Sequence, residues 1–265
     1  MPCFLSLHKW RVVDVYGIFI LGTAGCGKSL LASSLAEWLG RESKSVVIVN
    51  LDPGALRLPY FPQVDVRKYI SLQELMEKYG LGPNGALIMA ADLLADQAPR
   101  LSEEIAALNP EYAIIDTPGQ MELFAFRVSG PYLARELSLD QKMVLYLFDA
   151  PFCSDPFNYV SNLFLSVAVH LRFTLPQVNV LTKMDLLSEQ TIKTILQWST
   201  VPGMLEATLL SQAGGSVPLL ARDLLAAISR LRFDFSMIAS SARYFTNFVN
   251  LVAAIERTLT RGEKE

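Results

Sequence analysis

Cysteine is scarce in this sequence. It occurs only three times in 265 residues, as Cys3, Cys26 and Cys153. Three thiols spaced so widely exclude a disulfide framework and a cysteine-based metal site. We therefore expect reduced thiols, as in a cytoplasmic protein.

Charged residues are also few, at 18%, and the chain has no basic run. The formal net charge is −3, so the charge balance gives no reason to expect a direct nucleic-acid partner. Hydrophobic residues make up 51% of the chain, and the mean hydropathy is +0.31. This composition has two interpretations: a parallel sheet buried on both faces, or a large apolar surface for a protein partner.

A segment able to cross a bilayer is missing as well. The most apolar helix candidate, 160–173, contains Asn162, His170 and Arg172 and is too short to span a membrane. Residues 1–15 mix charged with apolar side chains and lack the apolar core of a signal peptide. We expect a soluble, cytoplasmic protein with no membrane partner.

Apolar, strand-like segments alternate with segments of helical spacing. Strands are expected at 16–21, 45–51, 112–115, 143–148, 178–181 and 235–239. Helices are expected after the first strand and at 66–79, 85–108, 121–137, 156–171 and 245–259. This alternation predicts an α/β fold with a mostly parallel sheet flanked by helices. We predict one domain over 1–265, with an N-terminal extension at 1–15 and inserted helices at 187–234.

The segment 22–29 reads GTAGCGKS and fits G-x-x-x-x-G-K-[ST], the phosphate-binding loop of P-loop nucleotidases. It lies between a predicted strand and a predicted helix, as the motif requires. Its glycines let successive N–H groups point at a phosphate, and the helix N-terminus adds positive potential. Lys28 is expected to reach the β- and γ-phosphates, and the Ser29 hydroxyl to bind Mg²⁺. The expected nucleotide contacts here are Gly22, Thr23, Ala24, Gly25, Cys26, Gly27, Lys28 and Ser29.

A second motif, Asp116-Thr117-Pro118-Gly119, fits D-x-x-G after a strand. The Asp116 carboxylate can hold Mg²⁺ through water, and the Gly119 N–H can meet a γ-phosphate. Gln120 either orients the attacking water or is an ordinary first-turn helix residue. Asp52 is either a second carboxylate on the metal side or the start of a turn before Pro-Gly.

A third motif, Thr182-Lys183-Met184-Asp185, resembles the guanine-reading N-K-x-D loop with Thr in first place. Asp185 can accept hydrogen bonds from N1–H and the 2-amino group of guanine, whereas adenine lacks that pattern. The Lys183 stem can lie along the base plane. Ser241-Ala242 fits the short loop beside the guanine O6 edge. The expected ligand is therefore GTP or GDP rather than ATP.

The succession of motifs is more specific than any one of them. Around the three already described, the chain carries Asn50-Leu51-Asp52-Pro53, Leu58-Pro59-Tyr60, Asp65-Val66-Arg67 and Leu81-Gly82-Pro83-Asn84-Gly85. This order resembles the GPN-loop GTPase family of archaea and eukaryotes, with this chain an archaeal-like member. The resemblance is specific over about 16–186 and looser over 187–265.

The resemblance implies a SIMIBI-class P-loop fold and a homodimer or pseudo-homodimer. It implies that the Gly82-Pro83-Asn84 loop of one subunit reaches the nucleotide of the other, where Asn84 donates its amide to phosphate. It also places Gln120 and Asp116 at the attacking water and Asp52 beside Mg²⁺. A neutral amide stabilises developing charge less than a guanidinium does, so slow turnover is expected.

Two functions are consistent with these motifs. The first is a Mg²⁺-dependent GTPase that converts GTP and water to GDP and phosphate as a dimeric, nucleotide-controlled switch. The second is a nucleotide-dependent assembly or chaperone-like factor with a protein client, because eukaryotic relatives are associated with RNA polymerase biogenesis. An ATP-driven partitioning or metallochaperone enzyme is disfavoured, because those relatives carry a lysine where this chain has Thr23 or Ala24.

Overall fold

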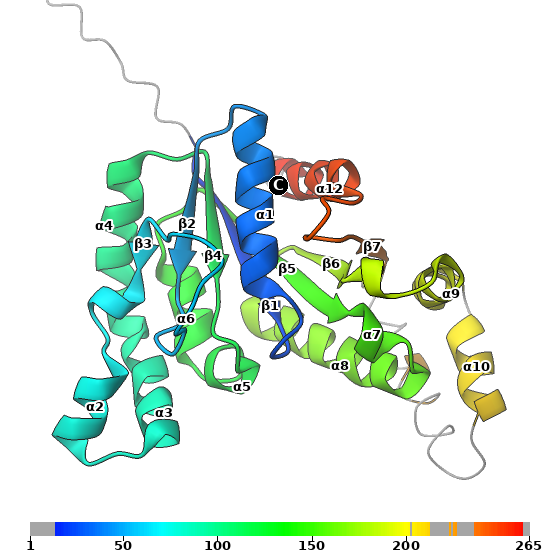
Figure 1. The fold of residues 1–265 in the computed structure, drawn as a ribbon, viewed down its shortest axis with the longest axis horizontal. Helices are drawn as coiled ribbons and strands as arrows, with labels where there is room; N and C mark the ends of the chain where they lie inside the picture. Colours follow the sequence, from blue (N-terminus) through cyan, green and yellow to red (C-terminus); the bar gives the residue numbers. More distant parts are fainter. Residues whose placement is uncertain (1–13, 202, 213–222, 224, 227–235, 262–265) are drawn as a thin grey trace, which may run out of the picture.

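Seven strands form one parallel sheet in the order β3-β2-β4-β1-β5-β6-β7 (Figure 1). The computed structural model describes residues 14–201, 203–212, 223, 225–226 and 236–261. All pairings between the named strands are parallel, which confirms the predicted α/β class. The strands are β1 (Tyr16–Gly22), β2 (Val46–Asn50), β3 (Val64–Asp65), β4 (Tyr112–Asp116), β5 (Gln141–Asp149), β6 (Gln177–Thr182) and β7 (Met237–Ala239).

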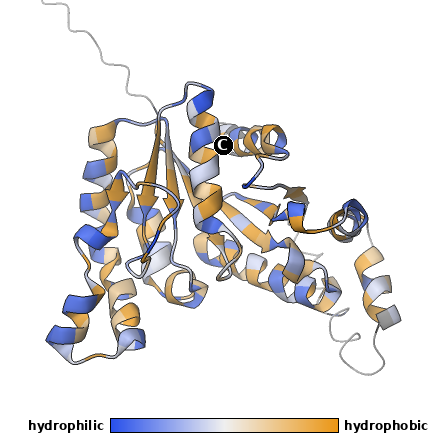
Figure 2. Cartoon of the chain, in the orientation of Figure 1, coloured by the Kyte–Doolittle hydropathy of each residue, from blue (hydrophilic) through white to orange (hydrophobic). Residues whose placement is uncertain are grey.

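Helices lie on both faces of this sheet, and its strands are largely hydrophobic (Figure 2). The buried side chains form two cores. One face packs against α1 (Lys28–Arg41) and α12 (Phe248–Arg261). All six residues 143–148 of β5 are fully buried. Alternate residues of a strand enter opposite cores, so a central strand must be apolar throughout. Of the two interpretations of the apolar composition, burial on both faces holds for this sheet.

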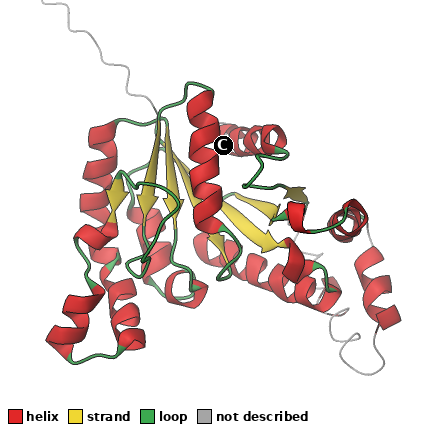
Figure 3. Cartoon of the chain, in the orientation of Figure 1, coloured by secondary structure: helices red, strands yellow, loops and turns green. Residues whose placement is uncertain are grey.

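The remaining helices cover the opposite face or extend beyond the sheet (Figure 3). They are α2 (Leu72–Tyr79), α3 (Pro83–Leu93), α4 (Ala98–Leu108), α5 (Met121–Phe124), α6 (Ser129–Glu136), α7 (Ala150–Cys153), α8 (Pro156–Phe173), α9 (Glu189–Thr200) and α10 (Met204–Gln212). Short 3₁₀ turns are η1 (Val66–Lys68), η2 (Ala95–Gln97) and η3 (Met184–Leu186). No helix in the described ranges has both the length and the hydrophobicity of a membrane span.

Several predicted helices were wrong in their extent. The helix expected at 66–79 begins only at Leu72, where Ser71 accepts a hydrogen bond from the Glu74 N–H. The helix expected at 85–108 begins earlier, at Pro83, and divides into α3, η2 and α4. Pro99, near the start of α4, lacks the N–H that a continuous helix would use.

The helix expected at 121–137 divides into α5 and α6. A Cβ on Gly130 would lie 2.2 Å from the Phe124 carbonyl oxygen, so the chain turns tightly here. The two-residue strand β3 was not predicted. Of the predicted strand 235–239, residue 235 lies outside the described residues and the strand begins at Met237. The last helix begins at Phe248 rather than 245.

The predicted insert at 187–234 contains α9 and α10, and most of its remainder lies outside the described residues, as do residues 1–13. The single-domain organisation stays a prediction. Because the strands are parallel, their carboxyl ends share one edge of the sheet. The loops that carry the phosphate-side and base-side motifs leave from this edge, whereas Gly82-Pro83-Asn84 lies between α2 and α3.

Candidate nucleotide-binding site

The loop between β1 and α1 has the backbone geometry of a phosphate cradle. Gly27 caps α1 in the left-handed region, at φ +99°, which side chains disfavour. Gly22 has φ +151°, and a Cβ there would lie 2.8 Å from Cys26 Sγ and 2.9 Å from the Leu147 oxygen. Burial raises the pKa of the Cys26 thiol, so Cys26 is a small buried loop residue rather than an activated nucleophile.

Lys28 folds back over this loop and is almost completely buried. Its ammonium donates to the carbonyl oxygens of Gly22 at 2.9 Å and Thr23 at 3.0 Å. A third, longer contact of 3.4 Å reaches the carbonyl oxygen of Gly119, after β4. The positive charge therefore lies where the phosphate loop meets the D-x-x-G loop.

Asp116, at the end of β4, is only 1% exposed. Its Oδ2 accepts a hydrogen bond of 2.6 Å from the hydroxyl of Tyr60. Burial raises the pKa of Asp116, and the neighbouring Ser29, Tyr60 and Lys28 oppose that shift. Burial and the adjacent carboxylate also raise the pKa of Tyr60, which keeps its hydroxyl protonated as a donor.

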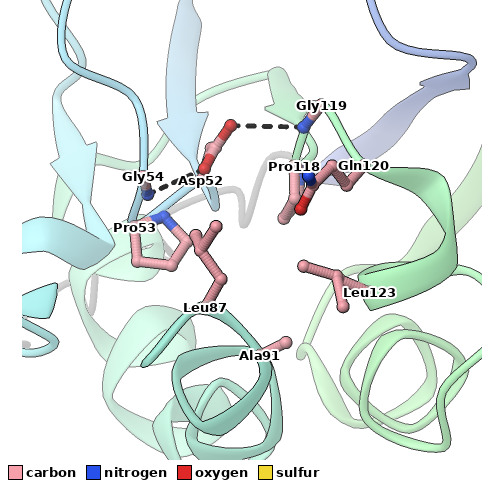
Figure 4. A pocket seen from close by; sticks show the side chains of 9 residues that line it. All are labelled: Asp52, Pro53, Gly54, Leu87, Ala91, Pro118, Gly119, Gln120 and Leu123. Carbon is pink, nitrogen blue, oxygen red and sulfur yellow. Dashed lines mark hydrogen bonds between the residues drawn. The ribbon is translucent and has the colours of Figure 1, made fainter. Parts of the chain in front are cut away.

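Asp52 joins two loops (Figure 4). Its Oδ1 accepts from the Gly54 N–H at 2.8 Å, as a turn-starting aspartate does. Its Oδ2 accepts from the Gly119 N–H at 3.2 Å. The turn role is thus present, and the same carboxylate also reaches the N–H expected to meet a γ-phosphate.

The sequence assigned no role to a polar cluster that supports Asp52. The Asn50 side chain accepts from the Asp52 N–H at 3.0 Å and donates to Asp65 at 2.9 Å. Arg67 binds the Asp65 carboxylate through Nε and Nη2 and donates from Nη1 to the Ala55 oxygen at 2.7 Å. Burial acts to raise the pKa of Asp65, but the hydrogen bonds from Arg67 and Asn50 outweigh it and lower that pKa. The motifs Asn50-Leu51-Asp52-Pro53 and Asp65-Val66-Arg67 were the signals in the sequence for this cluster.

The predicted base-side residues follow β5 and β6. Thr182 donates from Oγ1 to the Cys26 oxygen at 2.8 Å, with the Phe148 oxygen at 3.1 Å. Lys183 forms an ion pair of 2.8 Å with Asp149. Asp185 lies exposed in η3.

The Ser-Ala loop after β7 lies against this region. The Met184 N–H donates to the Ser240 oxygen at 3.3 Å, which joins the β6 and β7 loops. Ser34 of α1 donates to the Ala242 oxygen at 2.8 Å, and Ser241 is fully buried. The fold therefore brings the segments 182–185 and 241–242 together.

A pocket of about 170 Å³ opens beside Asp52 and Gly119. Figure 4 shows its lining of Asp52, Pro53, Gly54, Leu87, Ala91, Pro118, Gly119, Gln120 and Leu123. Gln120 lines this pocket and is exposed. Its side chain makes no N-cap hydrogen bond to α5.

Asn84 does not line this pocket. The Gly82-Pro83-Asn84 segment is exposed at the first turn of α3. Figure 1 shows the α2–α3 turn well away from the loop that follows β1. Within one chain, the structure therefore does not bring Asn84 to the phosphate loop.

The residues at this edge fit Mg²⁺. Asp116 Oδ1 is buried and has no partner of normal hydrogen-bond geometry among the described residues, although Ser29 is close enough to lower the pKa of Asp116. A hydroxyl and a carboxylate oxygen are hard ligands, and Mg²⁺ takes its other ligands from water and phosphate. Within the described ranges, no group of three or more His, Cys, Asp and Glu forms a complete protein site. Ser29 and Asp116 would hold the ion, and Asp52 is close enough to Asp116 to raise the pKa of its carboxyl.

Comparison with known proteins tests the resemblance. The family model described as "Conserved hypothetical ATP binding protein" matches residues 20–261. GPN-loop GTPase 3 of Debaryomyces hansenii is 36% identical over 225 residues, which cover 84% of this chain and 81% of that protein. The chain belongs to the GPN-loop GTPase family. GPN-loop GTPase 3 of Kluyveromyces lactis is likewise 36% identical, over 184 residues and 68% of each chain.

The crystal structure of a GTPase in apo form from Pyrococcus abyssi is also similar to this GPN-loop GTPase. It has a TM-score of 0.81 and 29% identity, covering 92% of this chain and 97% of that one. The P-loop fold and the GTPase activity predicted from the sequence are thereby confirmed. The family description names ATP, but the curated relatives are named GTPases, which supports the guanine assignment. The archaeal-like placement and the cytoplasmic location stay predictions.

Proposed function

We propose that this GPN-loop GTPase is a Mg²⁺-dependent, dimeric switch that hydrolyses GTP to GDP and phosphate. The observation that carries the proposal is the position of Gly119. Its N–H is held by Asp52 at 3.2 Å, and its carbonyl oxygen lies 3.4 Å from the Lys28 ammonium. A γ-phosphate bound to Lys28 and to this N–H would compete with Asp52, so the loop after β2 would respond to GTP and not to GDP.

The residues around the phosphates divide this reaction between them. The glycine-rich loop binds the phosphates through backbone N–H groups, and Lys28 offsets their charge. The Gln120 amide orients a water in line with the γ-phosphorus. The water oxygen forms a bond to phosphorus as the bond to the β-phosphate oxygen breaks, the water protons pass to phosphate oxygens, and GDP and phosphate leave. When bound at Ser29 and Asp116, Mg²⁺ neutralises charge that develops on the phosphate oxygens.

Base recognition belongs to the other half of the site. Asp185, exposed in η3, is free to accept from the guanine Watson–Crick edge, and Lys183 lies beside it. The hydrogen bond from the Met184 N–H to the Ser240 oxygen holds Ser241-Ala242 next to this segment. Ser241-Ala242 would then lie beside the guanine O6 edge. We expect these residues to select GTP over ATP.

Phosphate release measured with GTP and ATP tests the catalytic assignment. Gln120→Ala should lower the rate with GTP about a hundredfold, because a mispositioned water loses in-line geometry. GTP affinity should stay unchanged. Gln190→Ala, an exposed glutamine on α9, is the matched control. Equal rates for wild type and Gln120→Ala would remove Gln120 from the mechanism.

The dimer is supported by the exposure of Asn84 and its distance from the phosphate loop of its own chain. In a dimer the α3 end would reach the partner's nucleotide. Mixing equal amounts of Asn84→Ala and Lys28→Ala proteins should then restore about a quarter of the wild-type rate, because half of the dimers carry one complete site. No recovery under conditions where mixed dimers are demonstrated would contradict action in trans.

A second candidate function, an assembly factor for a protein client, is favoured by two side chains. Leu56 and Phe61, between β2 and β3, are 95% and 94% exposed. They lie on the loop that would respond to the γ-phosphate, and exposed apolar groups mark partner surfaces. The proteins bound in the presence of a GTP analogue should differ from those bound with GDP, and Leu56→Ser with Phe61→Ser should abolish that difference. The same set in every nucleotide state would rule out switching.

A further inference from the structure

Tyr60 is a buried residue of the site to which the proposed reaction gives no task. Only 9% of it is exposed, and its ring packs in the core on the α1 side of the sheet. Its hydroxyl donates to Asp116 Oδ2 over 2.6 Å. It comes from the loop 51–63, 56 positions from Asp116.

This loop is fastened to the molecule at several points. The Ala55 oxygen accepts from Arg67, and the Pro59 oxygen accepts from Ser33 of α1 at 3.3 Å. Leu56 and Phe61, by contrast, project into solvent. Tyr60 turns the other way and connects the loop to the end of β4.

The hydrogen bond from Tyr60 leaves the two oxygens of Asp116 in different states. Oδ2 has a partner, whereas Oδ1 is buried and has no hydrogen bond of normal geometry among the described residues, which leaves it available to a metal ion. The terminal torsion of an aspartate is broad and nearly two-fold, so a donor fixed to one oxygen determines where the other points.

We propose that Tyr60 is a positioning residue for Asp116: it orients the carboxylate so that Oδ1 faces the Mg²⁺ of the bound nucleotide. The inference rests on the proposed Mg²⁺-dependent function and extends it. It makes Mg²⁺ binding depend on the conformation of the loop 51–63. A protein partner that bound Leu56 and Phe61 would therefore change the affinity for Mg²⁺.

The chain offers a matched control. Tyr69 also donates its hydroxyl to a carboxylate, that of Glu104, at a partly buried position outside the site. Tyr60→Phe and Tyr69→Phe therefore remove the same chemical group from the same kind of bond. Both retain the aromatic ring, and thermal unfolding monitors the fold of each.

The primary measurement is the Mg²⁺ concentration that half-saturates binding of a fluorescent, non-hydrolysable GTP analogue. Tyr60→Phe should raise it about tenfold, the usual effect of losing a hydrogen bond to a charged group. Affinity for GDP in EDTA should change less than about twofold, because no metal contact is involved. Tyr69→Phe should match wild type in both. An unchanged Mg²⁺ requirement in Tyr60→Phe, or an equal rise in Tyr69→Phe, would overturn the inference.

A double-mutant cycle shows whether Tyr60 acts through Asp116. In an Asp116→Asn background, Tyr60→Phe should have no further effect on the Mg²⁺ requirement, and a persisting effect would contradict the inference. Without nucleotide or metal, hydrogen exchange over 51–63 should be faster in Tyr60→Phe, and unchanged exchange would count against the link. If wild type itself binds the analogue equally well without Mg²⁺, the proposed metal dependence fails. If wild type needs Mg²⁺ and Tyr60→Phe has the same Mg²⁺ requirement, the proposed function stands and the role of Tyr60 fails.

Discussion

The hydroxyl of Thr182 donates a hydrogen bond to the backbone oxygen of Cys26 over 2.8 Å, across 156 positions of sequence. Its other acceptor is the Phe148 oxygen, at 3.1 Å. Thr182 stands where the guanine-reading motif has asparagine, yet its proton points into the protein. It therefore ties the end of β6 to the phosphate loop, and the proposed function assigns base reading to Asp185 and Lys183.

Thr182→Val should consequently lower the affinities for GTP and for ATP by the same factor, about tenfold, because a buried carbonyl loses its hydrogen-bond donor. Isothermal titration with both nucleotides measures this. Thr200→Val, which removes an exposed helix hydroxyl, is the control and should leave both affinities unchanged. A loss confined to GTP would mean that Thr182 reads the base after all.

Asp185→Asn should behave in the opposite way. Two charge-assisted hydrogen bonds to guanine are lost, so GTP affinity should fall about a hundredfold while ATP affinity stays near its wild-type value. Competition binding between GTP and ATP gives the ratio directly. Glu189→Gln, a nearby exposed substitution, should not change it. Equal losses for both nucleotides would remove Asp185 from base recognition.

The Asp65–Arg67 pair predicts a pH-dependent stability. The pKa of Asp65 is lowered in the folded chain against the effect of burial, because Arg67 and Asn50 donate to the carboxylate. A lowered pKa contributes stability that is present above the unfolded value of about 3.9 and is lost as pH falls through the folded value. Asp65→Asn should therefore lower the free energy of unfolding by about 1–2 kcal/mol at pH 7 and by much less near pH 3.

Urea denaturation at the two pH values measures this difference. Asp92→Asn is the control, because Asp92 forms a similar two-bond pair with Arg127 at an exposed position. Asp92→Asn should lower the free energy of unfolding by under about 1 kcal/mol at neutral pH. A larger loss for Asp92→Asn than for Asp65→Asn would contradict the account of both pairs.

Gly130→Ala should destabilise the fold, because the new Cβ would meet the backbone of Phe124 at 2.2 Å. Backbone cannot yield as a flexible side chain does, so a loss of about 2–3 kcal/mol is expected. Gly40→Ala, inside α1 with no atom within 4 Å of the added Cβ, should instead stabilise by about 0.5–1 kcal/mol. Thermal unfolding of both variants measures the contrast. A stable Gly130→Ala protein would show that α5 and α6 can separate.

Local patterns predicted much of the fold and of the candidate site. The buried strands β1, β2, β4, β5 and β6 were recognisable as short apolar runs, each ending at a polar motif. Their parallel order followed from the helices between them. Errors fell where a side chain caps the start of a helix, as at Ser71, or where the backbone approaches itself closely, as at Gly130. Such breaks depend on geometry that hydrophobic spacing does not contain.

The sequence by itself determined the phosphate loop, the motifs after each strand and the family, because these are contiguous residues whose chemistry depends on spacing along the chain. Only the tertiary structure decided which residues meet: Thr182 with Cys26, Asp52 with Gly119, and Tyr60 with Asp116. Each contact joins segments that are distant in sequence and close only after the sheet forms. Leu58-Pro59-Tyr60 was visible as a motif, but nothing in its spacing indicates that its hydroxyl reaches the carboxylate at the end of β4.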